Sequence, residues 1–328
     1  MCSFGLFHTN REVAGARQPL AEQISASSVT CSSLAPDVRV TGRPVSGPAR
    51  KSADPRDDTG AAGYGRVMTD TKPLALVTGA SSGIGFELAK QFAQHGFDLV
   101  IDAEDPTIDT AAARLRAEGT EVIAVQADLR TPQGIEQLWT RVQGLGRPLN
   151  AAALNAGVGR GGAFVDTDWA DDLEIMQLNV VSTAALLKLC LVEMTGRNEG
   201  RVLVTSSIAS TMPGAYQPVY NASKSFVQSL TEAVQQERKD SAVTVTSLMP
   251  GPTDTDFFNR ADLDDTAMGK GPKDDPAQVA AQGFEAMMSG EEKLTAGSLM
   301  TKVQGAANKV LPDAFKSSAH EAMAKPRD

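Results

Sequence analysis

The sequence has few of the residues that build disulfides, metal sites or nucleic-acid interfaces. Its 328 residues include three cysteines, Cys2, Cys31 and Cys190, without paired spacing, and three histidines, so we expect neither a disulfide framework nor a metal site. The formal net charge of −9 argues against nucleic acid or an anionic membrane surface as a partner. No uninterrupted run of about 18 apolar residues is present, so we expect no membrane span. The shortage of cysteine favours a reducing compartment, and we expect a cytoplasmic protein.

The first 67 residues differ in composition from the rest of the chain. They are rich in Ser, Pro, Gly, Ala and Arg and show no period of about 2 or 3.6 residues, which predicts a disordered tail over residues 1–70. Three origins fit such a tail: upstream sequence placed before a true start at Met68, a transit peptide, or a linker that binds a partner. The first is favoured because Met68 lies just before the first predicted strand, and six acidic residues argue against a transit peptide.

Short apolar segments alternate with helical stretches from residue 74 onward. Segments such as GIGFELAKQFAQHG place Ile84, Leu88 and Phe92 on one face of a helix. The predicted strands cover residues 74–78, 97–101, 121–125, 149–155, 201–206 and 243–249. Strands that alternate with helices are typical of a parallel sheet with helices on both faces. We therefore predict a single α/β domain over residues 71–320, a Rossmann-type doubly wound parallel sheet, followed by a short tail at 321–328.

The motif VTGASSGIG follows the first predicted strand and opens the first long helix. In that position Gly79 can form a tight turn, Gly83 can let the backbone approach a pyrophosphate, and Gly85 can allow close packing of helix on strand. The N-terminus of the helix then faces the anion. The motif predicts a dinucleotide-binding loop whose contacts are Gly79, Ser81, Ser82, Gly83, Ile84 and Gly85.

The segment IDAEDP at the end of the second predicted strand bears on the choice of cofactor. It offers Asp102, Glu104 and Asp105 but no lysine or arginine, and an acidic side chain here binds the ribose hydroxyls of NAD. We expect Glu104 to make that contact, which favours NAD, with NADP as the alternative. Further cofactor contacts are predicted at the ends of later strands: Asp128, Leu129, Asn155, Ala156, Gly157, Pro250, Gly251, Thr253 and Thr255.

The stretch PVYNASKSFV places Tyr220 and Lys224 four residues apart, on one face of a helix. A free tyrosine has a pKa of about 10, and a neighbouring ammonium stabilises the phenolate and lowers that pKa. Tyr220 is thereby suited to act as a general acid or base. Ser207 ends the fifth predicted strand, where its hydroxyl can donate a hydrogen bond to a carbonyl oxygen.

These motifs together resemble the short-chain dehydrogenase/reductase family over residues 73–260. The resemblance is carried by TGASSGIG, the NAG at 155–157, Asn179, Ser207, the Tyr220 and Lys224 pair and the Pro-Gly at 250–251, in the family's order. It implies an oxidoreductase that moves hydride between a nicotinamide dinucleotide and a small-molecule carbonyl or secondary alcohol. It also implies that Asn179 holds a water that relays protons to Lys224, and that both Tyr220 and Lys224 contact the cofactor.

Two departures from the family pattern limit what the resemblance implies. Leu154 replaces the first of the usual two asparagines, and the C-terminal region lacks the signature of many tetrameric members. A homodimer or a monomer is therefore expected rather than a tetramer. Two other functions remain open: a non-catalytic cofactor sensor, disfavoured by the complete Ser, Tyr, Lys and Asn set, and an epimerase or dehydratase with tightly bound cofactor.

The segment after the Pro-Gly motif is expected either to cover the substrate or to form a surface loop. In the first case Phe257, Phe258, Leu263 and Met268 line an apolar pocket, and Gly269 and Gly271 permit movement of a lid. Residues elsewhere that are expected to face the pocket are Arg160, Phe164, Met212 and Tyr216. None of them identifies the substrate.

Overall fold

The computed structural model describes residues 71–308 and 311–325 of the chain. The predicted tail at 1–70, with Met68, Cys2 and Cys31, lies outside the described residues, and both its disorder and its origin stay predictions. The last helix reaches Ala324, within the segment that the sequence analysis assigned to a C-terminal tail.

Seven parallel strands form one sheet in the order β3-β2-β1-β4-β5-β6-β7. The strands are β1 Leu74–Thr78, β2 Asp98–Ala103, β3 Val122–Gln126, β4 Leu149–Leu154, β5 Gly200–Thr205, β6 Val243–Pro250 and β7 Lys293–Ala296. From β1 the chain extends the sheet first toward β3 and then, from β4 onward, in the other direction. Ligands bind at such a switch point, beyond the carboxyl ends of the strands. The predicted doubly wound parallel sheet is confirmed.

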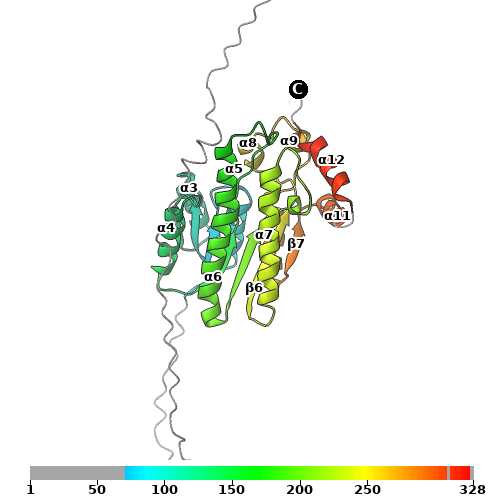
Figure 1. Cartoon of the computed structure of the whole chain (residues 1–328). Helices are drawn as coiled ribbons and strands as arrows, with labels where there is room; N and C mark the ends of the chain where they lie inside the picture. Colours follow the sequence, from blue (N-terminus) through cyan, green and yellow to red (C-terminus); the bar gives the residue numbers. More distant parts are fainter. Residues whose placement is uncertain (1–70, 309–310, 326–328) are drawn as a thin grey trace, which may run out of the picture. The chain divides into compact units, whose positions relative to one another are not determined.

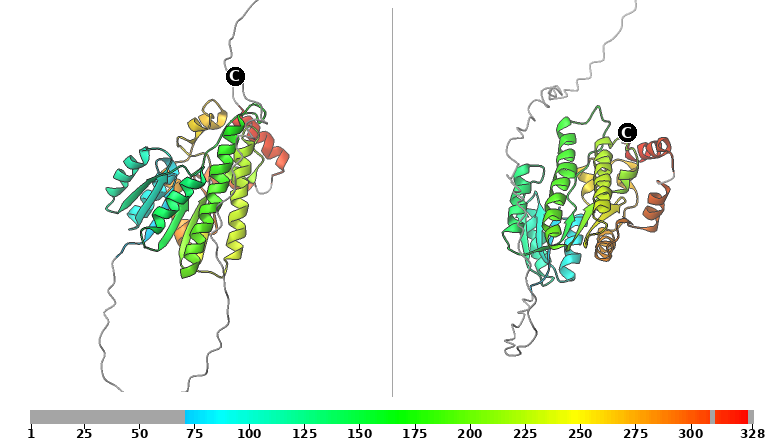
Figure 2. Two further views of the ribbon diagram at one scale, coloured as in Figure 1. Left: turned by 60° about the vertical axis from the view of Figure 1, so that its left-hand side comes forward. Right: turned by 60° about the horizontal axis from the view of Figure 1, so that its bottom comes forward.

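Helices cover both faces of the sheet, as Figures 1 and 2 show. One face carries α2 Gly83–Gln94, α3 Thr107–Arg116 and α10 Pro276–Ser289, and the other carries α4 Pro132–Gln143, α6 Thr183–Arg197 and α7 Pro218–Glu237. The remaining elements are α5 Trp169–Ile175, the π-helix η1 Met176–Ser182, the 3₁₀ helix η2 Ile208–Thr211, α8 Phe257–Arg260, α9 Ala267–Lys270, α11 Leu299–Ala307 and α12 Asp313–Ala324.

Local sequence signals set the ends of several helices. The Thr131 side chain accepts a hydrogen bond from Gly134 N at the start of α4, and the Asp275 side chain does the same for Ala277 N at the start of α10. A proline follows each cap, at the first helical position, where its missing N–H costs nothing. Asn198 ends α6 in the left-handed conformation, with φ 51°.

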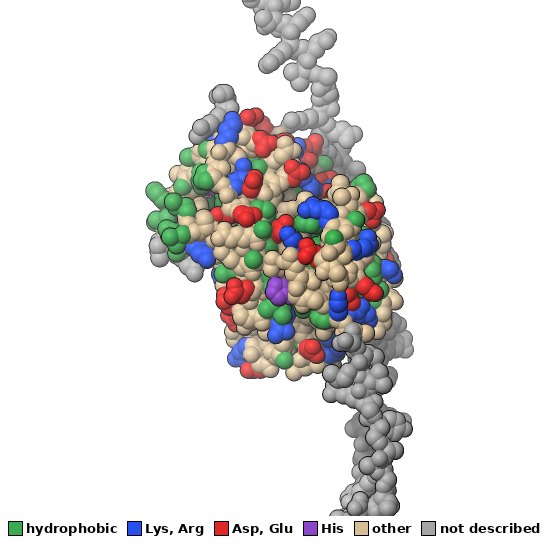
Figure 3. All heavy atoms as spheres, turned by 180° about the vertical axis from the view of Figure 1, so that it is seen from behind, with side chains coloured by type: hydrophobic (Ala, Val, Ile, Leu, Met, Phe, Trp, Pro, Cys, Tyr) green, Lys and Arg blue, Asp and Glu red, His purple; other side chains and the backbone are tan. Residues whose placement is uncertain are grey.

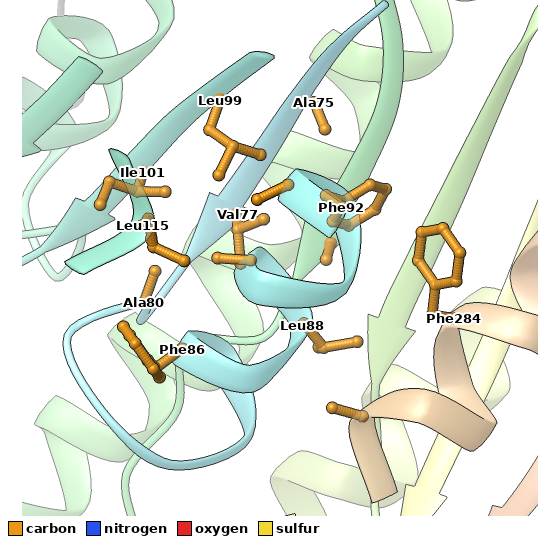
Figure 4. Close-up of a cluster of buried hydrophobic side chains, with 14 of the residues drawn as sticks. Ala75, Val77, Ala80, Phe86, Leu88, Phe92, Leu99, Ile101, Leu115 and Phe284 are labelled. Carbon is orange, nitrogen blue, oxygen red and sulfur yellow. The ribbon is translucent and has the colours of Figure 1, made fainter. Parts of the chain in front are cut away.

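The hydrophobic core on the α2 side of the sheet explains the position of α2 against β1 (Figure 4). Leu88 and Phe92 are fully buried against Val77, and the rings of Phe92 and Phe284 meet edge to face with centroids 5.2 Å apart. This packing joins α2 to α10 and holds the N-terminus of α2 beside the end of β1. The predicted apolar face of this helix is confirmed.

The helical run Trp169–Arg197, which comprises α5, η1 and α6, bears on the expectation of no membrane span. By length and composition it is apolar enough to cross a membrane, because mean hydropathy tolerates the few charges that interrupt the apolar residues. Core helices of soluble proteins meet the same criterion. In this structure Leu186, Leu187, Cys190 and Met194 are buried between the run and the sheet.

The C-terminal helices form an apolar edge of the molecule. Figure 3 shows hydrophobic side chains gathered at the edge where α11 and α12 lie. Leu299, Met300 and Val303 on α11 and Phe315 on α12 are all more than half exposed. Met300 also lines the large cavity described below, so the cavity opens beside this edge.

Candidate active site

The glycine loop between β1 and α2 forms a cradle that leaves room only for backbone. Gly79 and Gly83 have left-handed φ values of 64° and 56°, which side chains disfavour. A Cβ at Gly85 would lie 2.0 Å from the Gly79 carbonyl oxygen, and one at Gly83 would lie 2.9 Å from Thr255 Cγ2. Bare amides therefore surround the positive end of α2, an arrangement that fits the pyrophosphate of a dinucleotide.

A cavity of about 570 Å³ opens at the carboxyl ends of the strands, next to this cradle. It is lined by every residue that the sequence predicted to contact the cofactor, from Gly79 after β1 to Thr255 after β6, and by Ser207, Tyr220 and Lys224. Asn179 lies behind its wall, fully buried. The fold thus brings together, in one cavity, residues that are more than 170 positions apart in the sequence.

Tyr220 and Lys224 lie on the first turns of α7, which begins at Pro218. The Lys224 ammonium donates a hydrogen bond to the Thr205 carbonyl oxygen at 3.0 Å and lies 6.0 Å from the centre of the Tyr220 ring. Ser207 caps η2, where its hydroxyl oxygen accepts a hydrogen bond from Ala209 N at 3.1 Å. A hydrogen bond also joins Ser207 to Tyr220. The three side chains form one cluster.

The pKa of Tyr220 differs from the expectation. From the sequence we expected Lys224 to lower it, whereas in this structure burial is the largest effect and raises the pKa of Tyr220 to about 12, with the Ser207 hydrogen bond opposing that rise. The Lys224 ammonium is turned toward Thr205 and does not offset the burial. Burial also lowers the pKa of Lys224 to about 8.

Asn179 lies in the π-helix η1, a type of distortion often found at functional sites. Its amide accepts from Val158 N at 2.9 Å and donates to Val158 O at 2.8 Å and to Ser223 Oγ at 3.0 Å. Both donors of the side chain are therefore used to tie η1 to the end of β4 and to α7. A Cβ at Gly157 would lie 3.1 Å from Asn179 Oδ1 and 3.2 Å from Lys224 Nζ, so Asn179 and Lys224 face the same glycine.

Arginines that the sequence analysis missed surround the acidic end of the cavity. Glu104 forms ion pairs with Arg130 and with Arg260 of α8, both at 2.7 Å. Asp102 is buried at the end of β2, and its Oδ1 has no hydrogen-bond partner among the described residues. Burial, with Asp128 and Glu104 nearby, raises the pKa of Asp102 well above its usual range. An unpaired buried carboxyl oxygen in the cavity wall fits the polar adenosine end of a dinucleotide.

The segment after Pro250 and Gly251 covers part of the cavity, which agrees with the first of its two predicted roles, and we call this segment the lid. Phe257 lines the cavity with its ring centroid 5.2 Å from that of Tyr220, and Phe258 and Met268 line it too. Leu263 instead packs inside the lid, against Phe258. Arg160 also lies outside the cavity, where it pairs with Asp171 at 2.9 Å and with Asp262 of the lid at 2.8 Å. Of the other expected pocket residues, Met212 lines the cavity, whereas Phe164 and Tyr216 do not.

Comparison with known proteins shows the family to which this chain belongs. Residues 73–266 match the family model for short chain dehydrogenases. Oxidoreductase UcpA of Escherichia coli is 32% identical over 184 residues, which cover 55% of this chain and 69% of the relative.

Two solved structures share the fold and contain a dinucleotide. A short-chain dehydrogenase from Sphingobium yanoikuyae in complex with NADPH is 29% identical with a TM-score of 0.64, covering 68% of this chain and 87% of the other. A short-chain dehydrogenase/reductase from Burkholderia phymatum in complex with NAD is 25% identical with a TM-score of 0.63, covering 69% and 89%. The chain therefore belongs to the short-chain dehydrogenase family and is an NAD(P)-dependent oxidoreductase.

Proposed function

We propose that this protein interconverts a small-molecule carbonyl compound and the corresponding secondary alcohol, with Tyr220 as the general acid or base. The observation that carries the proposal is the placement of Ser207, Tyr220 and Lys224 in the same cavity as the glycine cradle. A nicotinamide ring, when bound, supplies or accepts the hydride. An absorbance assay at the nicotinamide band with a panel of carbonyls and alcohols tests the proposal, and binding of cofactor without turnover of any member would contradict it.

The side chains of the site bind the carbonyl oxygen and transfer the proton. In the reducing direction the hydroxyls of Ser207 and Tyr220 donate to the carbonyl oxygen, and Tyr220 transfers its proton to that oxygen as the alcohol forms. With a pKa of about 12 the phenol stays protonated at neutral pH, so it is ready to act as an acid. The phenolate that results attracts the Lys224 ammonium, which lies 6.0 Å from the centre of the Tyr220 ring and must turn from Thr205 O to stabilise it. Asn179 positions η1 beside Lys224, and we retain the proposal that a water held there returns the proton.

The predicted pH dependence follows from Lys224. Because burial lowers its pKa to about 8, the ammonium is present below that pH and is lost above it. We expect kcat/KM for carbonyl reduction to fall as the pH rises through about 8, while Tyr220 remains protonated. Steady-state pH profiles of the wild type and of Lys224→Met measure this: the variant should be slow and should lack the inflection. A wild-type profile that stays flat beyond pH 8 contradicts the assignment.

We propose NAD as the preferred cofactor. Carboxylates of Glu104, Asp105 and Asp128 gather at this end of the cavity, and the arginines near them are already paired with carboxylates. A 2′-phosphate would meet this negative charge, whereas ribose hydroxyls can donate to it.

The cofactor preference can be measured by calorimetric titration. We expect NAD(H) to bind at least about tenfold more tightly than NADP(H). The variant Glu104→Ala should reduce the difference between the two dissociation constants, because it releases Arg260 from its ion pair to meet a phosphate, whereas Asp128 and Glu174 still hold Arg130. Glu118→Ala is the matched control, since Glu118 is exposed and outside the cavity. Tighter binding of NADP(H) by the wild type would overturn the preference.

Three further expectations remain proposals. Exposed Val192 on α6 and Phe226 on α7 support a homodimer, because such apolar side chains favour association when they lie on neighbouring helices. We also retain a cytoplasmic location and a disordered N-terminal tail over residues 1–70, with Met68 as the favoured start.

A further inference from the structure

We propose that His320 selects the substrate: its Nε2 accepts a hydrogen bond from a hydroxyl carried by an otherwise apolar substrate, at a position remote from the reacting carbonyl. The proposal rests on the proposed function only for the location of the substrate. His320 lies on α12, is 2% exposed, and lines the cavity that contains Tyr220. It is one of the three histidines, and no role for it was predicted from the sequence.

The tautomer of His320 follows from its single recorded partner. Nδ1 lies 2.9 Å from the Ala215 carbonyl oxygen, and a carbonyl oxygen can only accept, so Nδ1 carries the proton. Burial lowers the pKa of the ring, which keeps it neutral at pH 7. Nε2 then has a free lone pair, and no residue in the described ranges donates to it. The cavity wall therefore holds an acceptor without a donor.

The ring is held at a fixed place relative to Tyr220. Ala215 belongs to the loop that leads into α7, so the Nδ1 hydrogen bond ties α12 to the same segment that positions the catalytic tyrosine. Lys316 Nζ strengthens this tie by donating to the Thr211 carbonyl oxygen at 3.0 Å, and Asn308 donates to Thr211 Oγ1 at 3.2 Å. A ligand that contacts both Tyr220 and His320 must therefore match their separation.

Apolar side chains make up much of the cavity wall outside the cofactor cradle: Met212, Phe257, Phe258, Met268, Met300 and Met323. The polar side chains of Gln217, Lys273 and Gln304 also line the cavity. Methionine adapts its shape to apolar ligands, and a few placed polar groups give such pockets their specificity. A hydroxyl on an apolar ketone or alcohol satisfies His320, whereas the analogue that lacks it leaves the buried acceptor unpaired. The geometry points to hydroxylated apolar ketones and alcohols as the substrate class.

Matched pairs of probes test this proposal. The probes are straight-chain methyl ketones from hexanone to dodecanone, each with and without a hydroxyl on the terminal carbon. In one pair the distance from the carbonyl to the hydroxyl should then match the distance from Tyr220 to His320. Dissociation constants by calorimetry and kcat/KM with NADH and with NADPH are measured for each member. In the wild type we expect the hydroxylated member to be favoured about tenfold at the matching length, mainly through KM.

The variants separate recognition from structure. His320→Asn places an amide N–H where Nδ1 was, which keeps the bond to Ala215 O but removes the Nε2 acceptor. We expect it to lower to about one the ratio of kcat/KM for the hydroxylated ketone to kcat/KM for its partner without the hydroxyl. His95→Asn, at an exposed histidine whose Nδ1 also meets a carbonyl, should leave this ratio unchanged. A purely structural role would weaken both members of a pair equally and preserve the ratio.

These measurements decide whether His320 recognises a substrate hydroxyl. The proposal is overturned if the wild type shows no preference at any length, or if His320→Asn keeps the preference. If hydroxylated ketones bind better in a manner that depends on His320 but no ketone is reduced, the inference about His320 stands and the proposed reaction fails.

Discussion

Tyr220→Phe is expected to lower kcat about a thousandfold while leaving the dissociation constant for the dinucleotide within a few-fold of wild type. The substitution keeps the ring that packs against Phe257, so the shape of the cavity is preserved. It removes the hydroxyl that bonds Ser207 and donates the proton to the carbonyl oxygen. Turnover by absorbance and cofactor binding by calorimetry, on the same preparation, measure the two effects separately.

Tyr216→Phe is the matched control for this experiment. Tyr216 lies four residues earlier, in the loop before α7, and does not line the cavity. Its substitution should leave kcat close to wild type. If Tyr220→Phe turned over substrate at a rate comparable with Tyr216→Phe, another group would have to supply the proton and the assignment of Tyr220 would be wrong.

Gly85→Ala is expected to cost about 3 kcal/mol of unfolding free energy and to abolish measurable cofactor binding. The new Cβ would lie 2.0 Å from the Gly79 carbonyl oxygen and 2.6 Å from Asn155 Nδ2, and the first of these is backbone that cannot turn aside. Relief requires α2 to move away from β1, which opens the cradle. Urea denaturation and calorimetric titration with NAD(H) and NADP(H) measure the two losses.

Gly196→Ala provides the comparison, because it makes the same chemical change inside a helix with no atom within 4 Å of the new Cβ. It should stabilise the protein by up to about 1 kcal/mol, through the lower entropy of the unfolded chain. Equal unfolding midpoints for Gly85→Ala and Gly196→Ala would show that the close approach at Gly85 has no energetic consequence.

Much of the fold and the cofactor cradle was predictable because both depend on short-range patterns. The run at 74–78 coincides with β1, and the other predicted strands differ from the structure by one or two residues at their ends. Strand β7 was missed because Lys293–Ala296 is short and only half-buried, so it lacks an apolar run. The π-helical geometry around Asn179 has no local sequence signal, since it is set by the Val158 and Ser223 contacts.

The parts of the site that were missed depend on contacts between distant segments. Arg260 lies 156 positions from Glu104, and His320 lies 105 positions from Ala215. From the sequence, the acidic stretch at 102–105 was interpreted as a loop without basic residues. The fold nevertheless brings Arg130 and Arg260 to it. The pKa of Tyr220 was misjudged for a similar reason: spacing shows that Lys224 is near, but only the structure shows that its ammonium turns toward Thr205.

The strand order has a consequence for how the protein is made. Because β1 is central and each later strand adds to an existing edge, the sheet can grow outward as the chain leaves the ribosome. The cofactor cradle lies between β1 and α2, whereas His320 and Met323 lie on α12. A nascent chain thus acquires its dinucleotide loop before the wall that faces the substrate.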